Sequence, residues 1–272
     1  MKGFYPPLPL RRLQTKLGIR SFRPKPHFLG IGTQKGGTST LYWVLRNHPE
    51  IFLPEPKELQ YFTLNSKEPV DWYSAFFSEA KAGQLRAEIT PYYVYHPAVP
   101  ERIYHLNPSM RMILLLRDPV ERALSQYFHA KRKGFEELSI EKAFSAEASR
   151  LAGSMEVVMR LGGVDYSHQK HSYVSRSRYD QQIMRYLNYF RPVQLLILRS
   201  EDLFEQPNFA LDKIKKFLDI SPFPAVNELV CANQGEGEAV GVSRSLRKQL
   251  RLKLLSTYNW LENELGLTWP QA

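Results

Sequence analysis

The sequence predicts an α/β fold with a parallel β-sheet that is flanked by helices on both faces. Three short apolar runs, residues 28–31, 112–116 and 194–198, have the length and composition of strands that are buried on both sides. Two weaker strand candidates cover residues 51–53 and 84–89. Helical patterns lie between these runs, and strands that alternate with helices are typical of a parallel sheet.

Helices are expected in the intervals between the strands. Residues 38–47 carry an apolar face, and the pattern stops before Pro49. Asp118 is a good N-cap residue and Pro119 suits the first turn, so a helix should run from Pro119 to about Lys133. Further helices are expected at residues 99–106, 139–147, 179–190, 208–218 and 245–265.

The chain is long enough and apolar enough to bury a sizeable core. It has 272 residues, of which 43% are hydrophobic, and these values suit one large α/β domain. We expect that domain to cover residues 27–272. Residues 1–26 are basic and proline-rich, and we expect a loosely ordered arm there. No segment is long and apolar enough to span a bilayer, although the basic arm suits a weak contact with an acidic membrane surface.

Charge and cysteine content narrow the function further. Lysine and arginine total 37 against 27 aspartate and glutamate, and the resulting net charge of +10 favours an anionic partner. Cys231 is the only cysteine, which excludes an intramolecular disulfide and a zinc site built on several thiolates. A reducing compartment such as the cytoplasm is therefore expected.

A glycine-rich segment follows the first strand and leads into a helix. Strand, glycine loop and helix form the arrangement that cradles phosphate, so the predicted sheet is P-loop-like. Gly32, Gly37 and Ser39 match the pattern G-x-x-x-x-G-K-[ST]. Thr38, however, occupies the lysine position, and the lysine of the loop is Lys35. This departure argues against a magnesium-dependent ATPase or GTPase.

A second signal follows the strand at residues 112–116. Arg117 leaves the carboxyl end of this strand, and Ser125 lies two turns into the next helix. Because ligands of parallel sheets bind beyond the carboxyl ends of the strands, both residues are candidates for phosphate binding.

Together these two segments resemble the cofactor site of sulfotransferases that use 3′-phosphoadenosine 5′-phosphosulfate (PAPS). The resemblance covers residues 27–269. Residues 56–62 (PKELQYF) are similar to the K-E-x-x-[FY]-F segment of heparan-sulfate-type and related bacterial enzymes, and residues 87–93 (AEITPYY) to their E-K-[ST]-P-x-Y segment. Residues 175–179 and 196–203 are similar to later motifs of the family in the same order.

The resemblance implies a role for each matching residue. Lys35 would stabilise charge on the leaving phosphate, and Glu58 would act as the general base. Arg117 and Ser125 would bind the 3′-phosphate. The 5′-phosphosulfate would be held by Lys35, Gly36, Gly37, Thr38, Ser39 and Thr40.

The sequence also departs from the family pattern. Ile89 stands where a lysine usually follows the glutamate, so that charge is either missing or supplied by Arg176 or Arg178. Gln60 stands where some relatives have a histidine, which removes a Glu–His pair at that position. A loop that closes over the cofactor would lie within residues 233–244, without its usual Lys-Gly pair.

The implied reaction transfers a sulfuryl group from PAPS to an acceptor and leaves 3′,5′-ADP (PAP). A hydroxyl group is favoured over an amine as the acceptor group, and no metal ion is expected. A carbohydrate or small alcohol is the favoured acceptor, and a cytoplasmic bacterial enzyme is expected. Nucleic acid is not expected as a partner, because the usual recognition motifs are missing. Two alternatives stay open, a P-loop-type phosphotransferase and a non-catalytic protein that binds polyanions.

Overall fold

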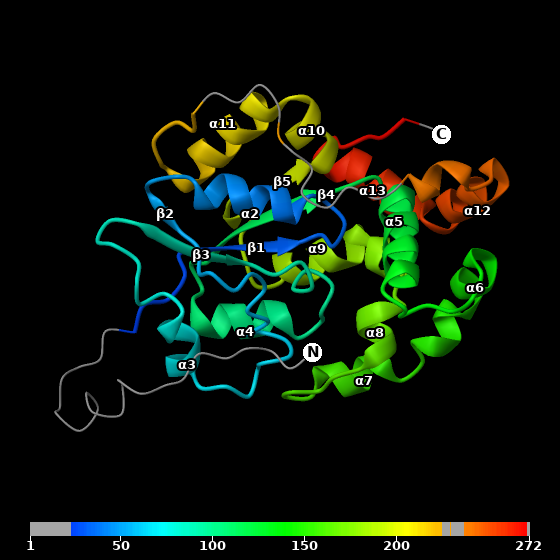
Figure 1. Cartoon of the computed structure of the whole chain (residues 1–272), viewed down its shortest axis with the longest axis horizontal. Coiled ribbons are helices and arrows are strands. Elements are labelled where there is room, and N and C mark those ends of the chain that lie inside the picture. Colours follow the sequence, from blue (N-terminus) through cyan, green and yellow to red (C-terminus); the bar gives the residue numbers. More distant parts are fainter. Residues whose placement is uncertain (1–22, 225–228, 230–236, 271–272) are drawn as a thin grey trace.

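The computed structural model of the chain confirms the parallel sheet and describes residues 23–224, 229 and 237–270 (Figure 1). Five strands pair in the order β2-β3-β1-β4-β5, and every pair is parallel. All five lie where the sequence predicts them. The strands are β1 (Phe28–Gly32), β2 (Ile51–Phe52), β3 (Leu85–Ile89), β4 (Arg111–Leu116) and β5 (Leu195–Arg199).

Helices cover both faces of the sheet because side chains alternate along each strand. In β4, Ile113 and Leu115 enter the core cluster formed with α2 (Thr38–Arg46), α10 (Ser200–Glu205) and α11 (Pro207–Leu218). Met112, Leu114 and Leu116 enter the larger cluster on the other face. Helices α4 (Val99–Leu106), α5 (Pro119–Arg132), α9 (Tyr179–Leu187) and α13 (Leu255–Leu265) contribute to that second cluster.

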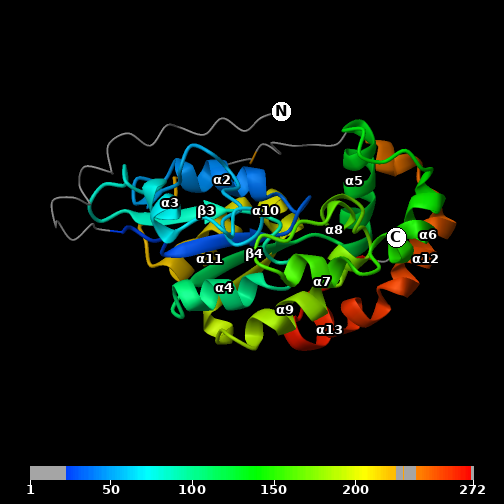
Figure 2. The same ribbon diagram turned by 90° about the horizontal axis from the view of Figure 1, so that it is seen from below.

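The carboxyl ends of the strands face a further group of helices. These are α5, α6 (Ile140–Arg150), α7 (Ser154–Met159), α8 (Tyr166–Lys170) and α12 (Arg244–Lys253). Figures 1 and 2 both place α5, α6 and α12 beyond the same end of the sheet, toward which the strands in Figure 1 point. This is the edge where the predicted site residues lie.

Two helix predictions differ from the structure. The helix expected at residues 245–265 is two helices, α12 and α13, which meet at Leu254. Leu254 is fully buried, and the break lets each helix turn its own apolar side inward. The helix expected at residues 179–190 ends at Leu187. The short helices α3 (Val70–Ala75), α7, α8 and α10 were not predicted.

The described chain begins with residues that already pack against the domain. Arg23 pairs with Asp71 at 2.7 Å, and Lys25 Nζ donates to Leu106 O at 3.2 Å. Residues 1–22 of the predicted arm lie outside the described residues. In the described part of the chain, no helix is both long enough and apolar enough to cross a membrane.

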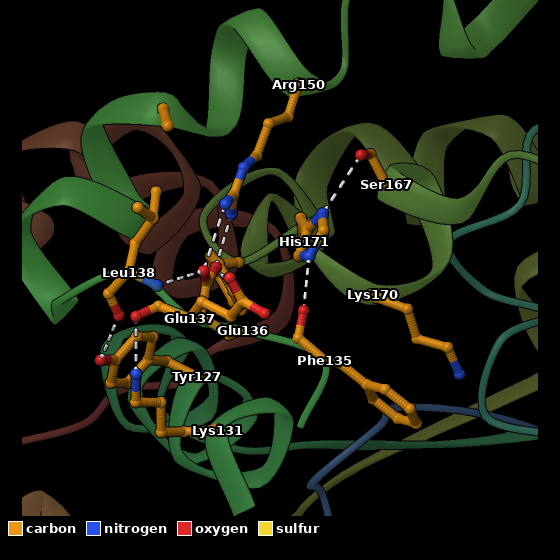
Figure 3. Close-up of polar contacts among 12 residues, drawn as sticks. Tyr127, Lys131, Phe135, Glu136, Glu137, Leu138, Arg150, Ser167, Lys170 and His171 are labelled. Carbon is orange, nitrogen blue, oxygen red and sulfur yellow. Dashed lines mark hydrogen bonds and ion pairs between the residues drawn. The ribbon is translucent and has the colours of Figure 1, made fainter. Parts of the chain in front are cut away.

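The connection between α5 and α6 is anchored by a buried ion pair (Figure 3). The carboxylate of Glu136 is fully buried and pairs with Arg150. It also accepts hydrogen bonds from Tyr173 Oη at 2.8 Å and from Leu138 N at 2.9 Å. Burial alone would raise the pKa of Glu136, but these donors outweigh it and lower the pKa to about 2.

We expect Glu136→Gln to lower the free energy of unfolding at pH 7 by about 2–3 kcal/mol. Because the folded-state pKa lies below that of a free glutamate, this stabilisation is present above about pH 5 and fades as the pH falls toward 2. Urea denaturation at pH 7 and pH 3 measures both effects. Glu137→Gln is the matched control, since Glu137 is adjacent and exposed. Equal stability of the two variants at pH 7 would contradict the prediction.

Candidate active site

The loop between β1 and α2 brings its backbone close to its neighbours. A Cβ atom at Gly36 would lie 2.5 Å from Thr33 Oγ1 and 2.9 Å from Leu115 O. Gly37 has a φ of 88°, and a Cβ atom there would lie 3.1 Å from the ring of Phe204. Thr33 fixes the base of the loop, because its N–H and its hydroxyl both donate to Leu115 O, at 2.8 and 2.9 Å. Only glycine fits both positions, as in a phosphate-binding turn.

The first turn of α2 suits an anion. Gly37 caps the helix without a side-chain hydrogen bond, and the turn contains no acidic residue. Thr38, Ser39 and Thr40 form this turn, as predicted. The positive end of the helix dipole therefore points toward the glycine loop.

Lys35 stands at the crown of the loop with a φ of 68°. Its charge reaches His129 on α5, whose pKa is lowered to about 4, first by burial and then by Lys35. His129 is therefore neutral at pH 7. Sequence reasoning did not identify His129, since a single histidine within a helix carries no spacing signal.

The predicted base segment lies directly beside the glycine loop. Lys57 Nζ donates to Ser39 Oγ at 3.0 Å and lies 3.2 Å from Glu58 Oε1. Gln60 Nε2 lies 3.5 Å from the other carboxylate oxygen of Glu58. The side chain of Glu58 is 40% exposed, so it can receive a ligand from solvent. Lys57 thus joins the two segments that sequence analysis selected separately.

Backbone strain is concentrated in these two segments. Lys35, Glu58 and Gln60 have φ values of 68°, 65° and 55°. Among the described residues other than glycine, only Asp219, which ends α11, also has a positive φ. Residues in this conformation cost energy and persist where the surrounding contacts hold them, which is frequent at functional sites.

A buried carboxylate holds the Glu58 segment in place. Glu88 is 1% exposed and accepts hydrogen bonds from Leu59 N at 3.2 Å and Thr90 Oγ1 at 2.9 Å. Its other oxygen accepts from the hydroxyls of Tyr73 and Tyr93, both at 2.7 Å. Burial raises the pKa of Glu88, and the four donors oppose that shift. Glu88 therefore positions the residue next to Glu58.

The predicted 3′-phosphate pair lies at the end of β4 and on α5. Arg117 follows β4 directly and is partly exposed, and its carbonyl oxygen accepts from Tyr179 Oη at 3.1 Å. Asp118 caps α5 as predicted, because its side chain accepts from Glu121 N at 2.9 Å. Ser125 is partly exposed two turns into α5. Both predicted residues can therefore reach a ligand beyond β4.

Position 89 provides no charge to the site. Ile89 is 1% exposed and packs under Gly30. A Cβ atom added at Gly30 would lie 2.8 Å from Cγ1 of Ile89. Of the two arginines considered as replacements, Arg176 contacts the glycine loop, since its Nη1 donates to Gln34 Oε1 at 2.6 Å. Arg178 is the N-cap residue of α9 and is partly exposed.

Two other expectations concern this region. Residues 233–236 of the predicted closing loop lie outside the described residues. Within the described ranges, no group of three His, Cys, Asp or Glu side chains is arranged to hold a metal ion. The aromatic segment Tyr92–Tyr95 is buried.

Comparison with known proteins identifies the family. The model described as "Sulfotransferase domain" matches residues 25–238. Human bifunctional heparan sulfate N-deacetylase/N-sulfotransferase 3 is 31% identical over 220 residues, which cover 78% of this chain and 24% of that protein. The chain spans 56% of another curated relative that it matches, so it corresponds to only part of these proteins.

Two solved structures share the fold. A sulfotransferase from Alicyclobacillus acidocaldarius superposes with a TM-score of 0.74 at 22% identity, covering 90% of this chain and 98% of that chain. Mouse sulfotransferase SULT7A1 complexed with PAP superposes with a TM-score of 0.52 at 14% identity, covering 89% of this chain and 87% of that chain.

We expect Gly36→Ala to weaken PAP binding about ten- to hundredfold, because a methyl group would collide with Thr33 and Leu115 and distort the loop. Isothermal titration calorimetry with PAP measures the change. Gly83→Ala, in the turn before β3, is the control: its φ of 86° strains the alanine as well, but a Cβ atom there meets nothing within 4 Å. Unchanged PAP affinity in Gly36→Ala would show that the loop does not hold the nucleotide.

Proposed function

Since the chain belongs to the sulfotransferase family, we propose that it transfers the sulfuryl group of PAPS to a hydroxyl group of a carbohydrate or another alcohol. The hydrogen bond from Lys57 to Ser39 carries this proposal, because it joins the expected base segment to the expected donor loop. The alternatives are weaker. Thr38 replaces the lysine that a P-loop phosphotransferase needs, and a polyanion binder would not require the strained Glu58 segment.

The loop residues fit the anionic end of the donor. Gly36 and Gly37 leave room for close approach of a phosphosulfate to the backbone, and α2 adds positive potential. Lys35 would stabilise negative charge on the leaving phosphate oxygen. Arg117 offers a planar set of donors that suits the 3′-phosphate, and Ser125 adds a hydroxyl.

Glu58 would accept the proton of the acceptor hydroxyl. Its carboxylate is partly exposed, beside the donor loop, and held by Lys57 and Gln60. In sulfuryl transfer, as in phosphoryl transfer, attacking and leaving oxygens lie roughly in line, so base and leaving-group cation belong on opposite sides of the transferred group. The arrangement of Glu58 and Lys35 on adjoining loops supports these roles.

The acceptor would bind between the Glu58 segment and residues 135–178. The two regions are in contact, because Gly162 N donates to Ser66 Oγ at 3.0 Å. Arg102 also bridges them, with hydrogen bonds to Phe62 O at 2.8 Å and Arg160 O at 3.3 Å. A carbohydrate acceptor is supported by the relative named as a heparan sulfate N-sulfotransferase.

A cytoplasmic bacterial setting belongs to the same proposal and rests on the single cysteine and on the resemblance to bacterial enzymes.

We expect the chain to bind PAP tightly and 5′-ADP more weakly, and not to prefer Mg-ATP to PAP. Arg117→Ala should weaken PAP binding about ten- to hundredfold, because a charge-assisted contact to the 3′-phosphate is lost. The affinity for 5′-ADP should barely change, since 5′-ADP lacks that phosphate. Calorimetry compares the three nucleotides. Arg191→Ala is the control, since Arg191 is an exposed arginine before the amino end of β5. A preference for Mg-ATP would favour the phosphotransferase instead.

We expect Glu58→Gln to lower the rate of sulfuryl transfer on the order of 10²-fold with PAP affinity unchanged, because the amide cannot accept the proton. The rate is measured with radiolabelled PAPS and an acceptor found by screening carbohydrates and alcohols. Glu55→Gln serves as the control, since Glu55 is an exposed carboxylate three residues earlier. A variant with the wild-type rate and the wild-type pH dependence would remove Glu58 from the mechanism.

A further inference from the structure

Lys170, the last residue of α8, is a partly buried cation with an aromatic partner. Its Nζ lies 4.4 Å from the centre of the Phe135 ring, and Figure 3 shows its side chain directed away from the Glu136–Arg150 pair. Within the described residues, Lys170 forms no ion pair with a carboxylate. A half-buried ammonium group loses hydration, and the ring face recovers only part of that loss. The site therefore favours an anion that is supplied from outside the chain.

The backbone around Lys170 is fixed to the glycine loop. Arg176 Nη2 donates to His168 O at 2.9 Å and to Gln169 O at 3.0 Å, while its Nη1 donates to Gln34 in the loop. Arg176 is itself 2% exposed and lies against the rings of Tyr92 and Tyr95. The buried guanidinium of Arg176 thus connects Gln169, the residue before Lys170, with Gln34, the residue before Lys35.

The ring beneath Lys170 is held just as firmly. His171 Nε2 donates to Phe135 O at 2.9 Å, and the other ring nitrogen of His171 lies 3.1 Å from Ser167 Oγ (Figure 3). The adjacent Glu136 is anchored by Arg150. Because the chain is held at Phe135 by His171 and at Glu136 by Arg150, the ring that contacts the ammonium group of Lys170 has a defined position.

Glu58, one of the two proposed catalytic residues, lies within electrostatic reach of Lys170. Burial lowers the pKa of Lys170 and Arg176 lowers it further, while the negative charge of Glu58 acts in the opposite direction. The pKa of His129 is lowered by burial, by Lys35 and also by Lys170. Lys170 and Lys35 thus act on the same histidine, and Arg176 joins the residues that precede them, Gln169 and Gln34.

We propose that Lys170 is a second catalytic cation, which contacts the sulfuryl oxygens while the group passes from donor to acceptor. The inference rests on the proposed function. In the transfer step the bond between sulfur and the phosphate oxygen breaks, and its electron pair stays on that oxygen beside Lys35. A bond forms between sulfur and the acceptor oxygen, whose proton passes to Glu58. Lys170 neutralises the sulfuryl oxygens between these two points, where fixed charges have most effect on the barrier.

The test separates charge from packing with three variants. Lys170→Met keeps the apolar stem on Phe135 and removes the charge, whereas Lys170→Arg restores a charge. Lys142→Ala, at an exposed position on α6, is the matched control. The rate is followed as PAP released from PAPS in a single turnover with water as acceptor, and PAP affinity is measured by calorimetry.

We expect Lys170→Met to lower the rate on the order of 10²-fold, with PAP affinity within about twofold of the wild type, because PAP lacks the sulfuryl group. Lys170→Arg should recover most of the rate. A wild-type rate in Lys170→Met, equal losses in the Met and Arg variants, or a matching loss of PAP affinity would each overturn the inference. If the unmodified chain neither binds PAP nor consumes PAPS, the proposed function itself fails, a result distinct from all three.

Discussion

The buried carboxyl group of Glu88 is the contact on which the position of the Glu58 segment depends. A carboxylate with no solvent needs donors for all its lone pairs, and Glu88 obtains four from Leu59, Thr90, Tyr73 and Tyr93. These donors come from the end of β3, from α3 and from the segment that follows Glu58. Satisfying one buried carboxyl group therefore fixes the relative positions of three elements, and it holds the strained backbone at Glu58.

Arg176 has the corresponding role on the other side of the glycine loop. Its buried guanidinium has no carboxylate partner among the residues that the structure describes, and it is satisfied by hydrogen bonds to Gln34, Ser172 and two backbone carbonyls. Glu88 thus holds the Glu58 segment through Leu59, and Arg176 holds the glycine loop through Gln34. Because removing a partner from a buried charge is expensive, both anchors resist rearrangement when a charged ligand arrives.

Most of the fold could be predicted from the sequence, because continuous apolar runs between turn signals specify buried parallel strands. The break at Leu254 could not, since no glycine or proline marks it and only tertiary packing requires it. The glycine loop and Arg117 were accessible as residue patterns at strand ends, and Glu58 was accessible through the family resemblance. The surroundings of Lys170, Arg176 and His129 are set by contacts between distant segments, which no local spacing records.

The positive φ angles at Lys35, Glu58 and Gln60 set a limit on engineering. Glycine would relax this backbone, so a selection for heat resistance alone would favour glycine at positions where the proposed mechanism uses the side chains. Gains in melting temperature there would come with loss of turnover, the familiar trade-off between stability and activity. More robust variants should instead be sought far from the carboxyl edge of the sheet.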